Sequence, residues 1–162
     1  YDSPRAAEEP RVLAALGPKM LELARDRAIG AHPYFVPVEH TRRAREALGA
    51  GPLLAPELAV VLERDPNRAR AIARRHTVPY LARENYTNNL RRLDYGDDDF
   101  ADGGSDRLVD ALVGWGSLDD IVERAYAHLE AGADHVCIQV LPADPAAIPR
   151  REWRELAAAL FG

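Results

Sequence analysis

The stretch Val12–Met20 reads VLAALGPKM and is the clearest guide to the architecture of this protein. Its first five residues are a short apolar run, typical of a strand that is buried on both faces. Gly17 ends the run, and Pro18 suits the first position of a helix because that position needs no backbone N–H. Apolar residues then recur at helical spacing until Gly30. The stretch therefore predicts one strand–turn–helix unit.

The same alternation returns along the chain. The first strand spans 12–16, and further strands are predicted at 31–36, 57–62 and 135–141; the helices are expected at 18–28, 37–48, 66–80, 118–129 and 149–160. Two extra helical pieces, at 86–93 and 108–113, follow the third strand. Such alternation predicts an α/β fold with a parallel sheet and right-handed crossovers. Four units fit either a small open sheet or half of a (β/α)8 barrel, which usually needs about 250 residues.

Length and composition narrow the class of protein. The chain has 162 residues and a net charge of −5, which suits one globular domain and argues against a nucleic-acid partner. Its single cysteine supports neither a disulfide framework nor a cysteine zinc site. The sequence has no run of apolar residues long enough for a membrane span and begins without the apolar core of a secretory signal. We therefore predict a soluble, cytoplasmic protein.

The beginning of the chain bears on the choice between the two architectures. Position 1 is Tyr, and the only methionine is Met20. Because removal of an initiator methionine requires a small second residue, we expect position 1 not to be the natural start. Residues 1–10 are interpreted as a linker or severed loop and residues 11–162 as the domain. This expectation favours the half-barrel, with its N-terminal half missing.

The turn after the first strand is a candidate anion site. Its residues are Leu16, Gly17, Pro18, Lys19 and Met20. Glycine lets a ligand approach the backbone closely, and the free N–H groups and dipole of the following helix attract negative charge. Lys19 is the only lysine of the chain. The turn therefore points to a phosphate site, although an ordinary turn with a solvated lysine has the same spacing.

A second group of candidates could line a substrate pocket. These residues are His32, Tyr34, His40, Asn85 and Asn88. The first three flank the end of the second strand, where sites of parallel α/β proteins assemble. The asparagines lie in a helical stretch that disfavours them, so they either line a cleft or tie a helix break to nearby backbone. The histidines lack metal-ligand spacing, and no catalytic residue is assigned.

Three other features are given structural interpretations. The acidic segment 94–106 does not match a calcium loop and is expected to be a solvated surface loop. Cys137 lies in an apolar strand and is expected to be a small buried residue. On the helix 118–129, Leu129 is expected on the buried side, whereas His128 is expected to be exposed.

Four segments together resemble the luciferase-like monooxygenase superfamily, and more narrowly its coenzyme F420-dependent oxidoreductases from actinobacteria. These segments are Val12–Ala24, Gly30–Thr41, Asn85–Leu90 and Gly132–Val136. The resemblance covers roughly residues 11–162. It departs from the family at Ile29, where an aspartate is common.

The resemblance implies a (β/α)8 barrel in which this chain supplies strands five to eight, with an insertion after strand seven. It implies that Leu16–Met20 lies against the phosphate of coenzyme F420, with FMN as the alternative, and that His32–His40 borders the substrate. Because the first four strands carry much of the family's cofactor pocket, the chain alone is expected to be inactive or nearly so. The family also suggests a homodimer.

Two classes of function therefore remain open. In the first, the chain is part of an oxidoreductase that transfers hydride between F420 or FMN and a small organic substrate. In the second, it is a non-catalytic α/β module or truncated remnant that binds a phosphorylated ligand or a partner chain. The strands are apolar on both faces, which favours the first class because a sheet of four strands standing alone would expose one face.

Overall fold

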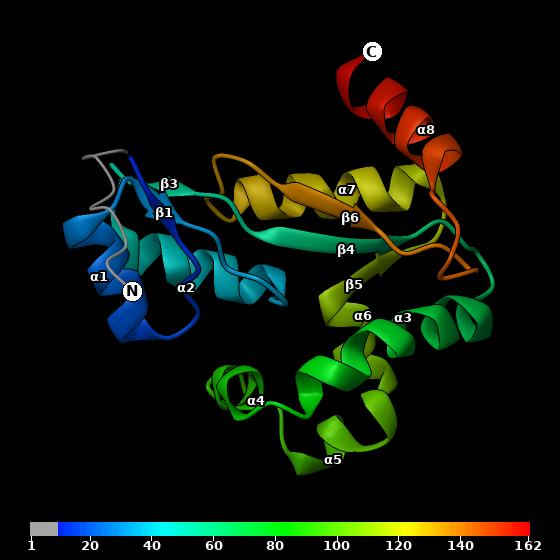
Figure 1. The fold of residues 1–162 in the computed structure, drawn as a ribbon, viewed down its shortest axis with the longest axis horizontal. Helices are drawn as coiled ribbons and strands as arrows, with labels where there is room; N and C mark the ends of the chain where they lie inside the picture. Colours follow the sequence, from blue (N-terminus) through cyan, green and yellow to red (C-terminus); the bar gives the residue numbers. More distant parts are fainter. Residues whose placement is uncertain (1–9) are drawn as a thin grey trace, which may run out of the picture.

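The computed structural model describes residues 10–162 (Figure 1). The predicted linker lies, except for its last residue, outside this range. The strands are β1 (Val12–Leu13), β2 (Gly30–Ala31), β3 (Leu53–Leu54), β4 (Glu57–Val61), β5 (Val113–Trp115) and β6 (Cys137–Val140). The helices are α1 (Pro18–Arg27), α2 (Val38–Leu48), α3 (Pro66–Leu81), α4 (Glu84–Arg91), α5 (Asp97–Phe100), η1 (Ala101–Gly103), α6 (Asp106–Leu112), α7 (Leu118–Glu130) and α8 (Arg150–Phe161).

β3 and β4 are two parts of one extended segment that organises the sheet. Pro56 lies between them and has no N–H for a sheet hydrogen bond. Hydrogen bonds nevertheless continue across it, from Ala55 N to Ala31 O (2.9 Å) and from Cys137 N to Pro56 O (2.9 Å). The segment therefore links two groups of three strands, β1-β2-β3 and β5-β4-β6.

All the strand pairs are parallel. β2 pairs with β3, while β4 pairs with both β5 and β6. Glu57 N donates to Pro33 O, beyond β2, and Val61 O accepts from Gly116 N, beyond β5, so these two strands share one edge of the segment. β6 lies along the other edge, where Cys137 aligns with Glu57. The fold is thus a parallel α/β architecture consistent with a (β/α)-barrel type.

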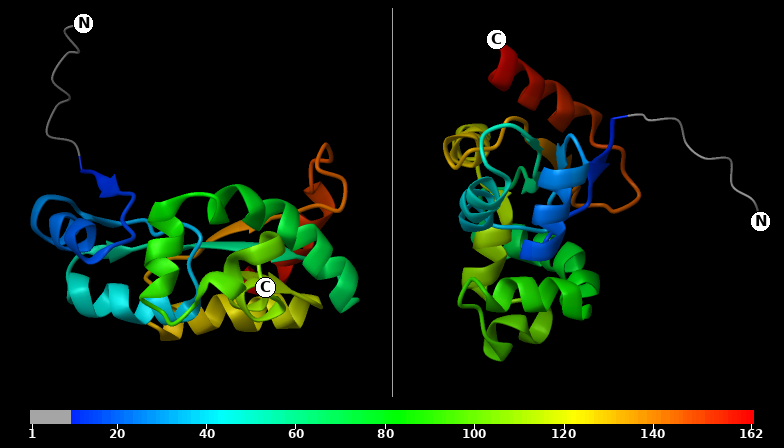
Figure 2. Two further views of the ribbon diagram at one scale, coloured as in Figure 1. Left: turned by 90° about the horizontal axis from the view of Figure 1, so that it is seen from below. Right: turned by 90° about the vertical axis from the view of Figure 1, so that its left-hand side faces the viewer.

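Helices cover both faces of β4 (Figures 1 and 2). Ala59 and Val61 face a core shared with α3, α4 and α6. Leu58 and Val60 face the opposite way, toward Ile121 of α7 and the end of the chain. Successive residues of a strand point to opposite faces, so an apolar strand can serve two cores at once. This is the physical reason that the sequence of β4 is a continuous apolar run.

A separate core lies under the first two helices. Leu21 and Ala24 of α1 and Ala44 and Leu48 of α2 pack against β2 and β3. Leu48 is 1% exposed and Ala24 is fully buried. This core fixes the start of α1 relative to the ends of β1 and β2.

The strand boundaries differ from those predicted at the sequence level. β1 and β2 each comprise only two residues. Within the predicted strand 31–36, Phe35 adopts a positive φ of 60°, which is incompatible with a β-strand. The strands β3 and β5 were not predicted. β5 directly follows α6, and its first residue, Val113, was predicted as the end of that helix because it continues the helical apolar pattern.

The extra helices after the third predicted strand are present, and the loop prediction for 94–106 was wrong in part. α5 and η1 occupy residues 97–103, and Asp99 orders the segment by accepting hydrogen bonds from Gly96 N and Ser105 Oγ. Cys137 is half-buried rather than buried.

The prediction of which side of α7 is buried also needs correction. His128 is fully buried, whereas Leu129 is 39% exposed. Ile121, Ala125 and His128 follow the spacing i, i+4, i+7, so they share the face that packs inward.

Four strands, β1, β3, β5 and β6, pair with only one other strand among residues 10–162. β1 and β3 pair only with β2, and β5 and β6 pair only with β4. The other edge of β3 is bonded in part, because Leu54 O accepts from Asp134 N (2.9 Å). Val12 is 41% exposed, and Gln139 is exposed on β6. Open strand edges of this kind offer unpaired backbone groups to further strands. The described residues therefore form an open sheet.

Candidate functional site

A cavity of about 390 Å³ opens beyond the carboxyl ends of β1 and β2. It is lined by Ala14, Ala15, Leu16, Gly17, Met20, His32, Tyr34, Asn85, Tyr86, Asn88 and Arg92. Three segments far apart in the sequence therefore meet there: the turn after β1, the segment after β2, and helix α4. Carboxyl ends of parallel strands are the usual place for ligand sites in this fold class.

The turn after β1 brings the free start of a helix to the cavity. Gly17 caps α1, and its carbonyl accepts the N–H groups of Met20 (3.0 Å) and Leu21 (3.1 Å). No side chain caps this helix start. Among the predicted residues, Leu16, Gly17 and Met20 line the cavity, whereas Pro18 and Lys19 are exposed on the first turn of α1. An uncapped helix start favours an anion.

The segment after β2 brings His32 and Tyr34 to the cavity. The Nδ1 atom of His32 lies 2.6 Å from the carbonyl oxygen of Ala55. The hydroxyl of Tyr34 donates to Gln139 Oε1 (2.8 Å) and accepts from the hydroxyl of Tyr80 (3.1 Å). Burial is the main cause that raises the pKa of Tyr34 above its usual value. Tyr34 is therefore a protonated phenol, able to donate a hydrogen bond but not to act as a base near neutral pH.

His40 does not line the cavity, unlike the prediction. It is buried beneath the turn, where its Nε2 lies 2.9 Å from the carbonyl oxygen of Leu16. Burial lowers the pKa of His40, so its ring is neutral at neutral pH. The reason for the difference is helical geometry: His40 lies on the same face as Thr41, Ala44 and Leu48, which α2 turns toward the core. It supports the turn from behind.

Helix α4 closes the other side of the cavity. Asn85 and Asn88 are exposed and line it, as the cleft interpretation of these residues requires. Arg92 joins them and is the only charged residue among the described residues that line the cavity. A Cβ atom added at Gly17 would lie 3.9 Å from an Arg92 guanidinium nitrogen, so the cation lies over the turn. Arg92 was not among the predicted residues, although its spacing of i+4 from Asn88 was a usable signal.

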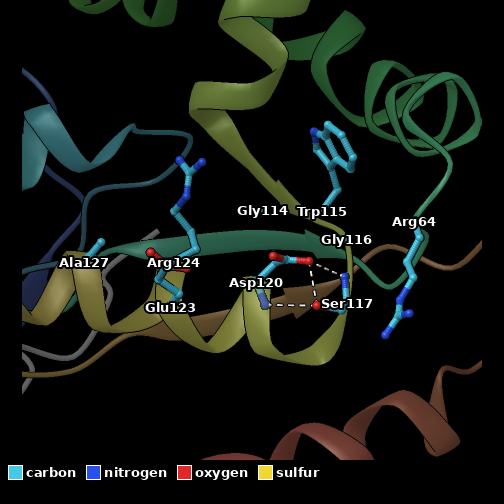
Figure 3. A pocket seen from close by; sticks show the side chains of 9 residues that line it. All are labelled: Arg64, Gly114, Trp115, Gly116, Ser117, Asp120, Glu123, Arg124 and Ala127. Carbon is cyan, nitrogen blue, oxygen red and sulfur yellow. Dashed lines mark hydrogen bonds between the residues drawn. The ribbon is translucent and has the colours of Figure 1, made fainter.

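A larger hollow of about 720 Å³ lies at the start of α7 (Figure 3). Arg64, Trp115 and Arg124 contribute to its walls. Its helix start is already occupied, because Asp120 Oδ2 accepts from Ser117 N (2.7 Å) and Ser117 Oγ (2.6 Å), as the dashed lines show. A carboxylate at this position competes with any incoming anion. The smaller cavity with its uncapped helix is therefore the better candidate site.

Within residues 10–162, the side chains of His, Cys, Asp and Glu do not form any group of three that could hold a metal ion. None of the described helices is both long and apolar enough to cross a membrane.

The histidine pair behind the turn gives a pH-dependent prediction. His128 is fully buried, its Nδ1 lies 2.8 Å from Thr41 Oγ1, and burial is the main cause that lowers its pKa to about 4. The unfolded chain, with a histidine pKa of about 6.5, binds the proton more readily than the folded chain, so wild type loses stability as the pH falls from about 7 toward 4. We expect the free energy of unfolding of wild type, measured relative to that of His128→Gln, to fall by about 2 kcal/mol from pH 7 to pH 5.

Urea denaturation of both proteins at several pH values measures this difference. Other titrating groups contribute equally to both proteins and cancel. A stability difference that stays constant between pH 7 and pH 5 would show that His128 titrates normally in the folded chain.

Comparisons with known proteins give the following results. No protein-family model matches the sequence, and no curated protein matches it. Solved structures do match: an F420-dependent secondary alcohol dehydrogenase in complex with an F420–acetone adduct (TM-score 0.60, 12% identity, covering 85% of this chain and 45% of that one); the coenzyme F420-dependent tetrahydromethanopterin reductase from Methanopyrus kandleri (0.57, 18%, 91% and 48%); and apo-MsnO8 (0.55, 19%, 97% and 52%).

These similarities establish a shared fold. The chain spans about half the length of the solved structures it matches. Identities of 12–19% leave the activity to be argued from the site.

Proposed function

We propose that this chain belongs to the luciferase-like family of coenzyme F420-dependent oxidoreductases and forms the C-terminal half of its (β/α)8 barrel. The main support is the convergence of the turn Leu16–Met20 and helix α4 on one cavity at the carboxyl ends of β1 and β2. Among the strands that pair on one side only, β1 and β6 have the edges where the remaining strands of a barrel would pair. Two of the similar structures are F420-dependent enzymes.

The residues of the cavity suit the phosphate end of the coenzyme. At the uncapped start of α1, Pro18 has no N–H and Met20 N donates to Gly17 O, so it is Lys19 that offers its backbone N–H, and Arg92 adds a positive charge over the turn. A volume of about 390 Å³ is at the lower end of the range for small-molecule sites, about 300–1,000 Å³. The cavity therefore suits one part of a large cofactor, with the rest of the cofactor held by the other half of the barrel.

The cofactor and the protein have separate roles in the proposed reaction. When bound, F420 or FMN supplies the hydride chemistry, while the protein supplies position and electrostatics. In this chain, the turn and Arg92 hold the phosphate, and Met20 and Tyr86 contribute apolar wall. The Tyr34 hydroxyl donates its proton to Gln139, so Tyr34 contributes its ring to the wall of the cavity. We propose that the chain alone binds the cofactor weakly and does not turn over.

A titration with three flavin-type probes tests the phosphate site. We expect the chain to bind FMN at least tenfold more tightly than riboflavin, because the two differ only in the phosphate. F420 is titrated in parallel, and its quenched fluorescence reports binding. Equal affinities for FMN and riboflavin would refute the phosphate site.

The contribution of Arg92 is expected to be of similar size. Arg92→Gln should weaken FMN binding about tenfold and leave riboflavin binding unchanged, since one charge-assisted hydrogen bond is lost. Arg154→Gln on α8 is the matched control, because Arg154 is exposed and does not line the cavity. If both substitutions weakened FMN binding equally, the net charge of the chain rather than the position of Arg92 would determine the affinity.

The second class of function predicts a different pattern. A non-catalytic module that binds phosphorylated ligands would bind ribose 5-phosphate as tightly as FMN. The apolar wall formed by Met20, Tyr86 and the alanines of the turn favours a ligand with an apolar body. We therefore expect ribose 5-phosphate to bind more weakly than FMN.

A further inference from the structure

Glu57 is a buried carboxylate for which the proposed chemistry has no direct use. It lies at the start of β4 and is 4% exposed. Its Oε2 accepts a hydrogen bond from the backbone N–H of Phe35 (3.1 Å). Its Oε1 is buried without a hydrogen-bond partner among the described residues. Burial of a carboxylate is costly, so a residue of this kind calls for an explanation.

Glu57 holds the segment after β2 at two points. Its own backbone N–H donates to Pro33 O (2.9 Å), and its side chain accepts from Phe35 N. These two contacts lie on either side of Tyr34. Phe35 has a φ of 60°, a left-handed conformation that is strained for a bulky residue. The carboxylate therefore fixes the backbone at the position where the chain turns most sharply.

The left-handed conformation of Phe35 also positions the tyrosines that line the cavity. The ring of Phe35 stacks on Tyr80, with centroids 4.9 Å apart, and meets Tyr86 edge-on at 5.5 Å. Tyr86 lines the cavity, and so does Tyr34, whose hydroxyl bonds to Gln139 and Tyr80. A change at the Phe35 backbone would move both cavity tyrosines.

We infer that Glu57 is a positioning residue, which sets the cavity-facing conformation of Tyr34 by clamping the backbone on both sides of it. The inference depends on the proposed function only in taking the cavity as the ligand site. Glu57 itself does not line the cavity. It acts through Phe35 and Tyr34.

The clamp is expected to respond to pH. Burial raises the pKa of Glu57 to about 7, and the hydrogen bond from Phe35 opposes this rise. The ionised carboxylate accepts the stronger hydrogen bond, so the clamp weakens as the pH falls through 7. The titratable side chains around it are His32 and Tyr34 beside β2, His76 on α3, Tyr86 on α4 and Cys137 on β6. Burial raises the pKa values of Tyr34, Tyr86 and Cys137 and lowers that of His76, which moves all four away from 7.

The first experiment needs no ligand. The amide resonance of Phe35 is followed by NMR from pH 5.5 to pH 8.5 in wild type, Glu57→Gln and Glu46→Gln. Glu46 is an exposed carboxylate on α2, so its substitution matches the change in net charge. We expect the Phe35 amide to titrate with a midpoint near 7 in wild type and Glu46→Gln, and to be independent of pH in Glu57→Gln. A titration that persists in Glu57→Gln would show that a group other than Glu57 causes it and would overturn the inference.

The second experiment measures the affinity for FMN at pH 6 and pH 8. The second ionisation of the FMN phosphate, with a pKa of about 6, changes affinity by up to about twofold between these pH values in every variant. We expect Glu57→Gln to show only this change because its amide oxygen still accepts the hydrogen bond, wild type to gain several-fold more affinity at pH 8 than Glu57→Gln does, and Glu57→Leu to bind at least tenfold more weakly. Circular dichroism checks that each variant is folded, and if Glu57→Leu does not fold, Glu57→Gln alone decides. The same pH dependence of affinity in wild type and Glu57→Gln would overturn the inference. A titrating Phe35 amide with no FMN binding would support the clamp and reject the proposed function.

Discussion

Replacing Gly30 with alanine is expected to lower the free energy of unfolding by about 3 kcal/mol, at the upper end of the usual effect of overpacking. Gly30 lies in β2, between Val12 of β1 and Leu53 of β3. A Cβ atom at this position would lie 2.2 Å from the carbonyl oxygen of Leu53 and 2.6 Å from its Cβ. Backbone cannot give way as a side chain can, so the strands must separate. Urea denaturation measures the loss.

Gly51→Ala is the matched control for this substitution. Nothing lies within 4 Å of a Cβ at Gly51, and its backbone lies outside the left-handed region. The same added methyl group should therefore change stability by less than about 1 kcal/mol, and a small gain is expected from the stiffer unfolded chain. Equal losses in the two variants would show that β2 is not packed against β3 as described.

Leu90→Ala is expected to cost about 3 kcal/mol and to weaken FMN binding as well. Leu90 is fully buried in α4 and belongs to the core that also contains Phe35 and Leu108. Truncation of a buried leucine removes its apolar contacts and leaves a cavity, with typical losses of about 2–5 kcal/mol. Because α4 carries Asn85 and Asn88 to the cavity, a loosened helix should also lower affinity. Urea denaturation and the FMN titration measure the two effects.

Leu129→Ala provides the control for this second prediction. Leu129 is on α7, 39% exposed, and does not line the cavity. We expect a loss below about 1 kcal/mol and unchanged affinity for FMN, because little apolar area leaves contact. Loss of stability in Leu90→Ala without loss of affinity would indicate that α4 is not needed for binding.

The fold class could be predicted because strands and helices leave different periodicities in a sequence. The apolar runs at 12–16 and 57–62, each followed by a proline that opens a helix, identified two strand–helix units. Strands β3 and β5 were missed because each is two or three residues long. Such short strands are held by pairing with distant partners, such as that of Val113 with Ala59, and local sequence carries no record of these pairs.

The candidate site shows the same division. Leu16, Gly17 and Met20 could be selected because a glycine turn before a helix has a local physical meaning. Arg92 and Tyr86 were not selected. Arg92 had a local signal, its spacing of i+4 from Asn88, but the position of both residues against the turn depends on α4 packing against a segment some 70 residues earlier in the chain. His40 was selected because it lies close in sequence to the end of the second predicted strand, but α2 directs its side chain into the core.

The sequence by itself determined what depends on neighbouring residues: the alternation of strands and helices, the helix that starts at Pro18, and the glycine turn before it. Only the tertiary structure decided which residues meet. It placed α4 against that turn, buried His128 and His40 behind it, and set Glu57 under Phe35. The physical reason is that periodicity reports the face a side chain occupies, whereas contacts between elements follow from packing across the whole chain.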